Sequence, residues 1–242
     1  MLLVLLATGC AGLDPVLSPK DILRDADLAY AERDRADART GADLLEEALA
    51  RRPDDPEALW RLARLEVFLG RPHAAWRRAE RAAELEPGSA QAALWAGYAG
   101  ALEIASRPVG ERLAEAPAVL GRLERATRLD PGLARAHLGL AILSLALEEE
   151  PSPAPFERPD AALHLSLARE LRPGLPEPHL LLARRLLAAG DPQGARHELE
   201  VLLGPPPEER DGPHFPEAQI AEWFAARESA RAMLALIPPS PR

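Results

Sequence analysis

Prolines recur along this chain at intervals that fit one pair of short helices. Five of them are separated by gaps of 34, 44, 42 and 34 residues: Pro53, Pro87, Pro131, Pro173 and Pro207. Proline lacks a backbone N–H and biases the preceding residue away from helix, so a helix is expected to end near each one. Between the first two prolines, Gly70 divides the apolar pattern into two short amphipathic helices. The sequence therefore predicts a row of helix pairs built on a 34-residue unit.

Small residues fall at fixed places in this unit. With Pro56 as position 1, Ala63 takes position 8, and the second helix carries alanines at 20, 24 and 27. Ala183 and Ala195 take positions 8 and 20 of the last unit. Small residues there allow paired helices to approach closely, and stacked pairs bury the apolar faces that one pair would expose. This period and layout are those of the tetratricopeptide (TPR) repeat. We expect an all-α, right-handed TPR superhelix of about five helix pairs plus a C-terminal capping helix.

The same register divides the chain into segments. The TPR solenoid is expected over residues 18–209, with repeats near 18–55, 56–89, 90–133, 134–175 and 176–209, followed by a loop and capping helix over 210–242. In the first repeat, Ser18 is the expected N-cap, Pro19 opens the first helix, and the second helix is expected over 41–52. Repeats three and four carry insertions, near 106–110 and 148–155. The acidic run that opens the second insertion is expected to be a solvated loop.

The N-terminus has the features of a bacterial export signal. Residues 1–9 form a short apolar run that ends in small residues, and the only cysteine, Cys10, follows it. Ala7-Thr8-Gly9-Cys10 resembles a lipobox, although no Lys or Arg precedes the run and Ala replaces the usual Leu. We therefore expect a lipoprotein signal peptide over 1–9, lipidation of Cys10 and a tether over 10–17. The alternative is an apolar N-terminus with an incidental cysteine.

Composition narrows the function. The net charge is −9 and Lys20 is the only lysine, so no basic stripe indicates a nucleic-acid partner. The sequence contains no phosphate-binding glycine loop, nucleophile elbow or His-Glu-x-x-His motif. His137 and His179 both occupy position 4 of a first helix, where packing explains them without a metal. The expectation is a non-catalytic protein with no cofactor and no metal.

Several stretches resemble one TPR family, the TatT component lipoproteins associated with tripartite ATP-independent periplasmic (TRAP) transporters. The resemblance runs from Asp21 to about Ile237, and it depends on residues 58–64, the two enlarged repeats, residues 177–183 and the closing Trp223 to Glu228. It implies a periplasmic lipoprotein, anchored to the membrane by lipid alone, that binds a periplasmic solute-binding protein. Apart from the resemblance, a hydrophobic small molecule is a second expected ligand, and a homo-oligomer is left open.

In a TPR solenoid, positions 5, 9 and 12 of each first helix face the concave groove. The residues expected at these positions to contact a ligand or partner, called here the concave set, are Trp60, Arg64, Val67, Leu94, Tyr98, Leu138, Ile142, Leu180, Arg184 and Leu187. Most are apolar, which predicts an amphipathic ligand or a partner helix, with the two arginines as isolated charges that could pair with a carboxylate. The alternative is a groove already filled by the chain's own insertions or C-terminal helix.

Three functions remain open at this stage. The first is the TRAP-transporter accessory, and the second is a general TPR adaptor for envelope protein assembly that grips peptide segments. The third is a cytosolic enzyme regulator, which requires that the N-terminus is not a signal.

Overall fold

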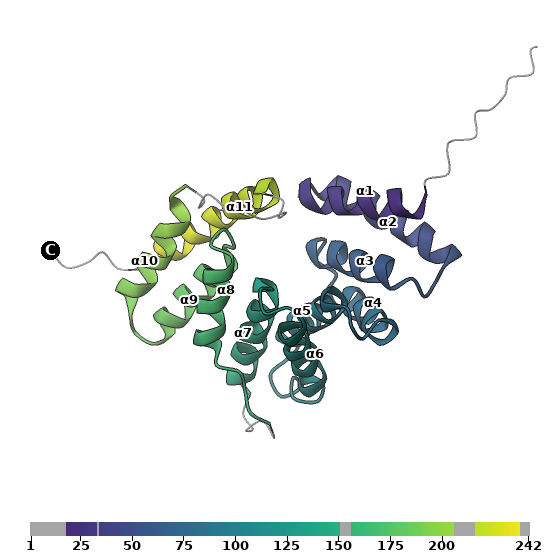
Figure 1. The fold of residues 1–242 in the computed structure, drawn as a ribbon. Coiled ribbons are helices and arrows are strands. Elements are labelled where there is room, and N and C mark those ends of the chain that lie inside the picture. Colours follow the sequence, from purple (N-terminus) through teal and green to yellow (C-terminus); the bar gives the residue numbers. More distant parts are fainter. Residues whose placement is uncertain (1–17, 33, 151–155, 206–215, 238–242) are drawn as a thin grey trace, which may run out of the picture.

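The computed structural model describes residues 18–32, 34–150, 156–205 and 216–237. Within these ranges the chain forms eleven helices and no strand (Figure 1). The expected signal peptide, Cys10 and the tether lie outside the described residues. The helices are α1 (Pro19–Glu32), α2 (Arg35–Arg51), α3 (Pro56–Phe68), α4 (Pro72–Leu85), α5 (Ala90–Ser106), α6 (Ala116–Leu129), α7 (Ala134–Glu148), α8 (Ala161–Leu171), α9 (Glu177–Ala188), α10 (Pro192–Leu203) and α11 (Pro216–Leu234).

Short polar side chains and prolines set where most of these helices begin. Side-chain oxygens of N-cap residues accept backbone N–H groups in the first turns of five helices, and these caps are Asp34, Asp55, Ser89, Asp160 and Asp191. Ser18 caps α1 as expected, because its hydroxyl accepts the N–H of Asp21 at 3.3 Å. Proline opens α3, α4 and α10, where its missing N–H costs nothing.

Two glycines turn the chain from the first helix of a repeat into the second. Gly70 and Gly190 both have φ of +79°, a left-handed conformation that residues with a Cβ rarely adopt. After α3, the N–H of Gly70 bonds the carbonyl of Val67 at 3.0 Å and that of Arg71 bonds Glu66 at 2.8 Å. The same two bonds follow α9 around Gly190, so both helices end in a Schellman motif.

Close approach of helices explains the small residues of the register. Ala63 and its second-helix partners Ala75, Ala79 and Ala82 have no exposed surface. Gly97 takes position 8 in the third repeat, where an added Cβ would lie 2.5 Å from Leu123 Cγ on α6. A side chain at this position would push α5 and α6 apart, so the residue size is dictated by the helix packing.

The acidic residues at the end of α7 correct part of one expectation: Glu148 and Glu149 are exposed, but Glu149 and Glu150 also bond to the other insertion. Arg112, in the α5–α6 connection, is buried and donates to the Ala146 carbonyl at 2.7 Å and to Glu149 at 2.6 Å. Glu150 accepts the backbone N–H of Gly110 at 2.8 Å. Glu148 pairs with Arg185 on α9 at 2.7 Å. The remainder of this insertion, 151–155, lies outside the described residues.

One helix ends earlier than expected. The first four second helices, α2, α4, α6 and α8, end two residues before their prolines, whereas α10 ends at Leu203, four residues before Pro207. Gly204 follows directly as the C-cap in an extended conformation. A glycine lacks the packing side chain that would favour one more turn, and Pro205 comes next. Pro207 itself is outside the described residues.

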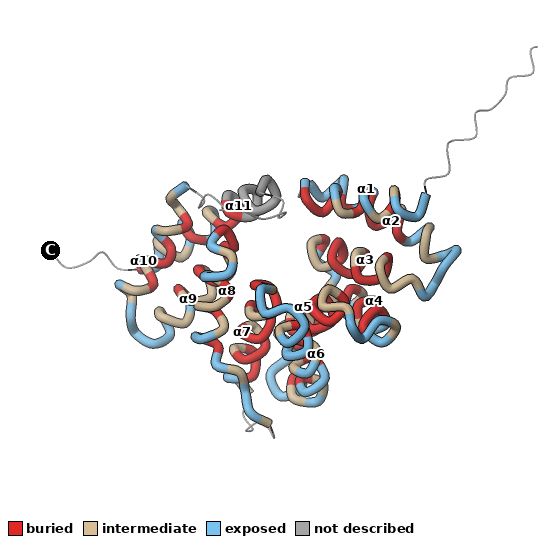
Figure 2. Tube along the Cα trace, viewed as in Figure 1, coloured by how far each residue is buried: buried red, intermediate tan, exposed pale blue. Residues whose placement is uncertain are grey.

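The helices follow a curved path whose two ends meet. α11 packs on α10 and also contacts α9 and α1, so the first and last helices adjoin (Figure 1). Burial is concentrated on α3, α5 and α7, while the described loop residues are mostly exposed or half-buried (Figure 2). Most of the core is continuous through the first four repeats, but α9, α10 and α11 enclose a cluster of their own around Trp223 and Leu199. This cluster covers the last repeat, which is the role expected of the capping helix.

Candidate functional site

The structure distributes the concave set over the first helices of repeats two to five, α3, α5, α7 and α9. Its members differ in exposure. Trp60, Arg64, Leu94, Tyr98 and Leu138 are buried, Arg184 is exposed, and the rest are half-buried, namely Val67, Ile142, Leu180 and Leu187. Apart from the half-buried Val67, the set is therefore buried on α3 and α5 and more accessible on α9, rather than uniformly open.

Arg64 departs from the expectation most clearly. The sequence predicted an isolated charge, and this is wrong, because its guanidinium pairs with Asp27 on α1. The guanidinium also lies 4.2 Å from the ring centre of Tyr30 and 5.2 Å from that of Trp60. Burial lowers the pKa of Arg64, and the Asp27 carboxylate opposes this by favouring the charged form. The charge of Arg64 is thus balanced by Asp27 and its guanidinium lies against aromatic rings, so it is not available to bind a ligand carboxylate.

Asp27 serves two arginines at once. Arg61, one turn before Arg64 on α3, donates from Nε to the Asp27 carboxylate at 3.0 Å and lies 4.1 Å over the Trp60 ring. Arg61 also pairs with Glu57 on its own helix. A single carboxylate of the first repeat therefore orients two cations of the second, and both cations lie against the aromatic face of Trp60.

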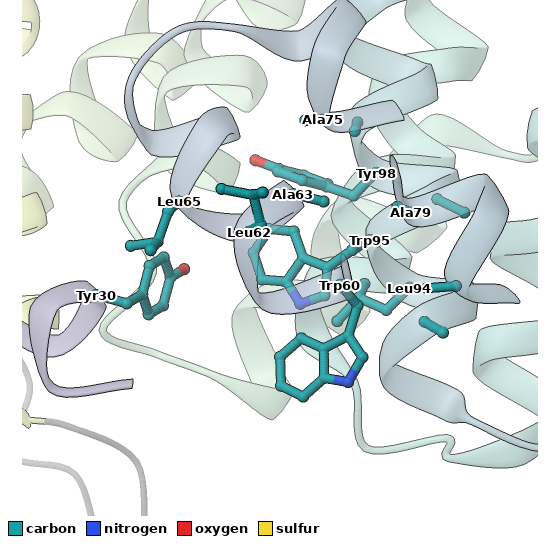
Figure 3. Packing of buried hydrophobic residues seen from close by; sticks show 14 of the residues in the cluster. Tyr30, Trp60, Leu62, Ala63, Leu65, Ala75, Ala79, Leu94, Trp95 and Tyr98 are labelled. Atoms are coloured by element: carbon teal, nitrogen blue, oxygen red, sulfur yellow. The ribbon is translucent and has the colours of Figure 1, made fainter. Parts of the chain in front are cut away.

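A band of aromatic rings continues from this cluster into the third repeat. Trp95 meets Tyr30 edge-on with ring centres 6.0 Å apart, and it meets Tyr98 in the same way at 5.9 Å. Arg135 on α7 lies 5.9 Å from the Tyr98 ring and pairs with Glu177 at 3.4 Å. The rings come from α1, α3 and α5, as Figure 3 shows for Tyr30, Trp60, Trp95 and Tyr98. We call these four residues the aromatic band.

Sequence reasoning did not assign four residues of this cluster to the site: Asp27, Tyr30, Arg61 and Trp95. A signal for two of them was present: with Pro19 as position 1 of the first repeat, Asp27 and Tyr30 take positions 9 and 12, which face the groove. Trp95 stands at position 6, outside the groove positions, and no pattern in the sequence marked it.

Three N–H donors in and beside the aromatic band are buried without a hydrogen-bond partner among the described residues. They are Trp60 Nε1, Arg64 Nε and Trp95 Nε1. A buried donor left unpaired is costly, so such groups favour an oxygen acceptor such as a carbonyl, a carboxylate or an ordered water. The chemistry of this region is therefore donor-rich and aromatic, with the charge of its arginines already balanced.

The accessible part of the concave set has a different character. Ile142 packs against the core of the first four repeats, whereas Leu180 and Leu187 pack against the C-terminal cluster, and all three keep partial exposure. Arg184 stands exposed on α9 between these leucines in the sequence. An apolar surface with one accessible cation suits contact with an amphipathic protein segment.

Three of the described histidines lie in packed or paired positions between helices. His179 is buried and pairs with Glu198 on α10 at 2.7 Å, and its ring meets Trp223 edge-on. His137 and His164 bring their Nδ1 atoms to 3.1 Å across α7 and α8. Among the described residues, no group of three or more His, Cys, Asp or Glu side chains is arranged to hold a metal ion.

No helix in the described part of the chain is long and apolar enough to cross a bilayer. No protein-family model matches the sequence, and neither does any curated protein. The structure resembles TTC0263, a thermophilic TPR protein of Thermus thermophilus, with a TM-score of 0.64 at 22% identity over 89% of this chain and 100% of that one.

The fold is that of a TPR protein. Pseudomonas aeruginosa PilF has a TM-score of 0.52 at 16% identity, covering 93% of this chain and 96% of its own. PilW, a widely conserved type IV pilus biogenesis factor, also has a TM-score of 0.52 at 16% identity, covering 91% and 99%. These likenesses confirm the predicted all-α TPR superhelix, and at such identities they establish the TPR fold alone.

Proposed function

We propose that this chain is a non-catalytic TPR scaffold that binds a partner protein through the concave set. The observation that carries the proposal is that three apolar residues at expected groove positions, Ile142, Leu180 and Leu187, are only half-buried, and that Arg184 on the same helix as the two leucines is exposed. Stacked repeats commonly present an extended concave surface to partners, and half-buried leucines with a neighbouring cation suit an amphipathic segment. The buried aromatic band keeps α1, α3 and α5 in register and so sets the curvature of that surface.

The finer proposal names the partner as the periplasmic solute-binding protein of a TRAP transporter. It is supported by the family resemblance of residues 58–64 and 177–183 and by the lipobox-like residues before Cys10. The chain would then be a periplasmic lipoprotein held at the membrane by a lipid on Cys10. A hydrophobic small molecule is a further ligand that the same apolar residues would accept, and the homo-oligomer remains part of the proposal.

One experiment tests anchor and partner together. The full-length chain, with a C-terminal tag, is cross-linked in its native cells and purified from the membrane fraction beside a Cys10→Ser variant. Recovery of a TRAP solute-binding protein with the unchanged chain, and a shift of the variant to the soluble periplasmic fraction, support the proposal. Equal membrane recovery of both chains contradicts the lipid anchor, and the absence of the solute-binding protein contradicts the transporter role.

The second candidate is a general adaptor for envelope protein assembly. The likeness of fold to PilW, a type IV pilus biogenesis factor, favours it. The same cross-linking experiment separates the two functions, because an adaptor of this kind would recover assembly proteins in place of a solute-binding protein.

A further inference from the structure

The junction between the fourth and fifth repeats is built differently from the others. First helices of successive repeats pack side by side at α1–α3, α3–α5 and α5–α7, but within the described residues α9 does not pack along α7. The apolar side chains across this junction are Leu175, Leu181 and Leu182, and the last two are only half-buried. By contrast, alanines on both sides of the α4–α5 junction are at most 2% exposed: Ala82, Ala83, Ala92 and Ala93.

Ion pairs add to the limited apolar packing between α7 and α9. Arg185 on α9 pairs with Glu148 on α7 at 2.7 Å, and Arg169 on α8 pairs with Glu198 on α10 at 3.0 Å. The Arg135–Glu177 pair is the third link across the same boundary. In the Arg185–Glu148 pair the two side chains are 38% and 45% exposed, so salt in solution screens this link.

Beyond the junction, α9, α10 and α11 hold together by themselves. Their cluster includes Ala183, Leu199 and Leu202 together with Trp223 of α11, which is fully buried. The Trp223 indole donates to the Gly204 carbonyl at 3.2 Å, and Arg227 also donates to the Leu202 carbonyl. These contacts make a unit with its own core, and a unit of this kind can move as one body against its neighbour.

At its far end this unit closes the molecule. α11 contacts α1, so the arc of repeats closes into a ring (Figure 1), and the repeat register assigns the concave set to the inner side of this ring. A folded partner could reach that surface from the side only if the ring opened between α1 and α11.

We propose that α9, α10 and α11 form an arm that opens the ring at the α1–α11 contact by rotating about the junction between α8 and α9. The ion pairs across the junction hold the arm in the closed position, so ionic strength and the loss of one pair shift it towards the open position. The arm would move with or without a partner. That the movement admits a partner to the concave set rests on the proposed function.

The test measures the distance between the two ends of the ring. Cys10→Ser removes the only native cysteine, and dyes are attached at Arg39→Cys on α2 and Glu228→Cys on α11, both exposed positions. Energy transfer is recorded in the full chain between 50 mM and 1 M NaCl, over which the screening length falls from more than about 10 Å to about 3 Å. The expected result is a lower transfer efficiency at high salt, with unchanged helicity by circular dichroism.

Variants assign the effect to the junction. Arg185→Gln is expected to lower the transfer efficiency already at 50 mM NaCl, and the exchange of Glu148→Arg with Arg185→Glu is expected to restore it. Arg81→Gln is the matched control, because Arg81 on α4 forms an exposed pair with Asp54, just before α3, at 2.8 Å and far from the α8–α9 junction. Transfer that is independent of both salt and Arg185 overturns the proposal, as does a change in transfer that is accompanied by loss of helicity. The measurement contains no partner, so it can support or overturn the moving arm even if the proposed function is wrong.

Discussion

Arg64 on α3 pairs with Asp27 on α1 across the boundary between the first two repeats, 37 residues apart in the sequence. The side chain of Arg64 is 9% exposed and that of Asp27 is 27% exposed, so the pair is largely shielded from water. Removing one member of such a pair leaves the other as an uncompensated charge, which costs more than the pair itself contributes.

Asp27→Asn is therefore expected to lower the free energy of unfolding by about 2–3 kcal/mol, less than for a fully dry pair because Asp27 keeps contact with water. Urea unfolding at neutral pH measures the change. Arg81→Gln provides the control at an exposed pair, where the expected effect is within about 0.5 kcal/mol. Equal effects of the two substitutions would mean that Arg64 is not held by Asp27.

Close helix approach at position 8 gives a second prediction. In Gly97→Ala the new Cβ would meet Leu123 Cγ at 2.5 Å and the Leu123 backbone nitrogen at 2.9 Å. Overpacking of this kind typically costs about 1–3 kcal/mol, which outweighs the gain in helix propensity of about 1 kcal/mol. Gly121→Ala is the control, since nothing lies within 4 Å of a Cβ added there on α6. The melting temperature should fall for Gly97→Ala and rise for Gly121→Ala. A rise in both variants would contradict the close approach of α5 and α6 at Gly97.

Acid should weaken the fourth repeat through its two histidines. Nδ1 atoms at 3.1 Å can share one proton, but two protonated rings would face each other with like charge. Burial lowers the pKa of both His137 and His164 from the ordinary 6.5, and Asp160 opposes the shift at His164. The folded chain then binds fewer protons than the unfolded chain, so stability is full above 6.5 and falls as pH drops through and below that value.

Unfolding free energies at pH 7.5 and pH 5.5 measure this dependence. The double variant His137→Gln and His164→Gln removes both groups, and its stability should change less between the two pH values. Glu198 does not interfere. Burial acts to raise the pKa of its carboxyl group, but the hydrogen bond from His179 and the charge of Arg169 outweigh it, so the pKa lies below the ordinary 4.5 and Glu198 stays charged at pH 5.5. If the double variant loses as much stability between pH 7.5 and pH 5.5 as the unchanged chain, the acid sensitivity comes from other residues.

Trp223 covers the apolar face of the last repeat, so its replacement should destabilise mainly the C-terminal helices. Replacing a fully buried Trp by Ala typically costs about 3–5 kcal/mol. Because α9, α10 and α11 share a separate core, Trp223→Ala should raise amide hydrogen exchange in these helices while protection in α3 to α6 is retained. Leu236→Ala is the control, since Leu236 is 80% exposed. Uniform loss of protection would show that the C-terminal cluster is continuous with the rest of the core.

Much of the fold could be predicted from the residues that set helix ends and helix spacing. Proline stops, the glycines between paired helices (Gly70 and Gly190) and small residues at position 8 act locally or within one pair, so a repeating register reveals them. The start of α2 could not be predicted from the repeating register. Its second half was expected from residue 41, but the helix begins at Arg35, because Asp34 caps a polar segment that has no apolar periodicity.

The candidate site was less accessible to sequence reasoning. The ion pairs of Asp27 with Arg61 and Arg64 join different repeats, and their existence depends on how far successive helix pairs rotate against each other. Register indicates which residues face the groove but not which of them neutralise one another. For the same reason Leu138, predicted as a contact, is fully buried, and a charge placed there would disrupt folding before it tested binding.

Binding through the accessible part of the concave set is the central claim, and titration calorimetry with the purified solute-binding protein tests it most directly. Ile142→Glu combined with Arg184→Glu changes a half-buried and an exposed member of the set, while Arg128→Glu changes an exposed residue on α6. The account predicts at least a tenfold weaker affinity for the double variant, about 1.4 kcal/mol, and an unchanged affinity for Arg128→Glu. Affinity equal to that of the unchanged chain in a fully folded double variant would contradict it.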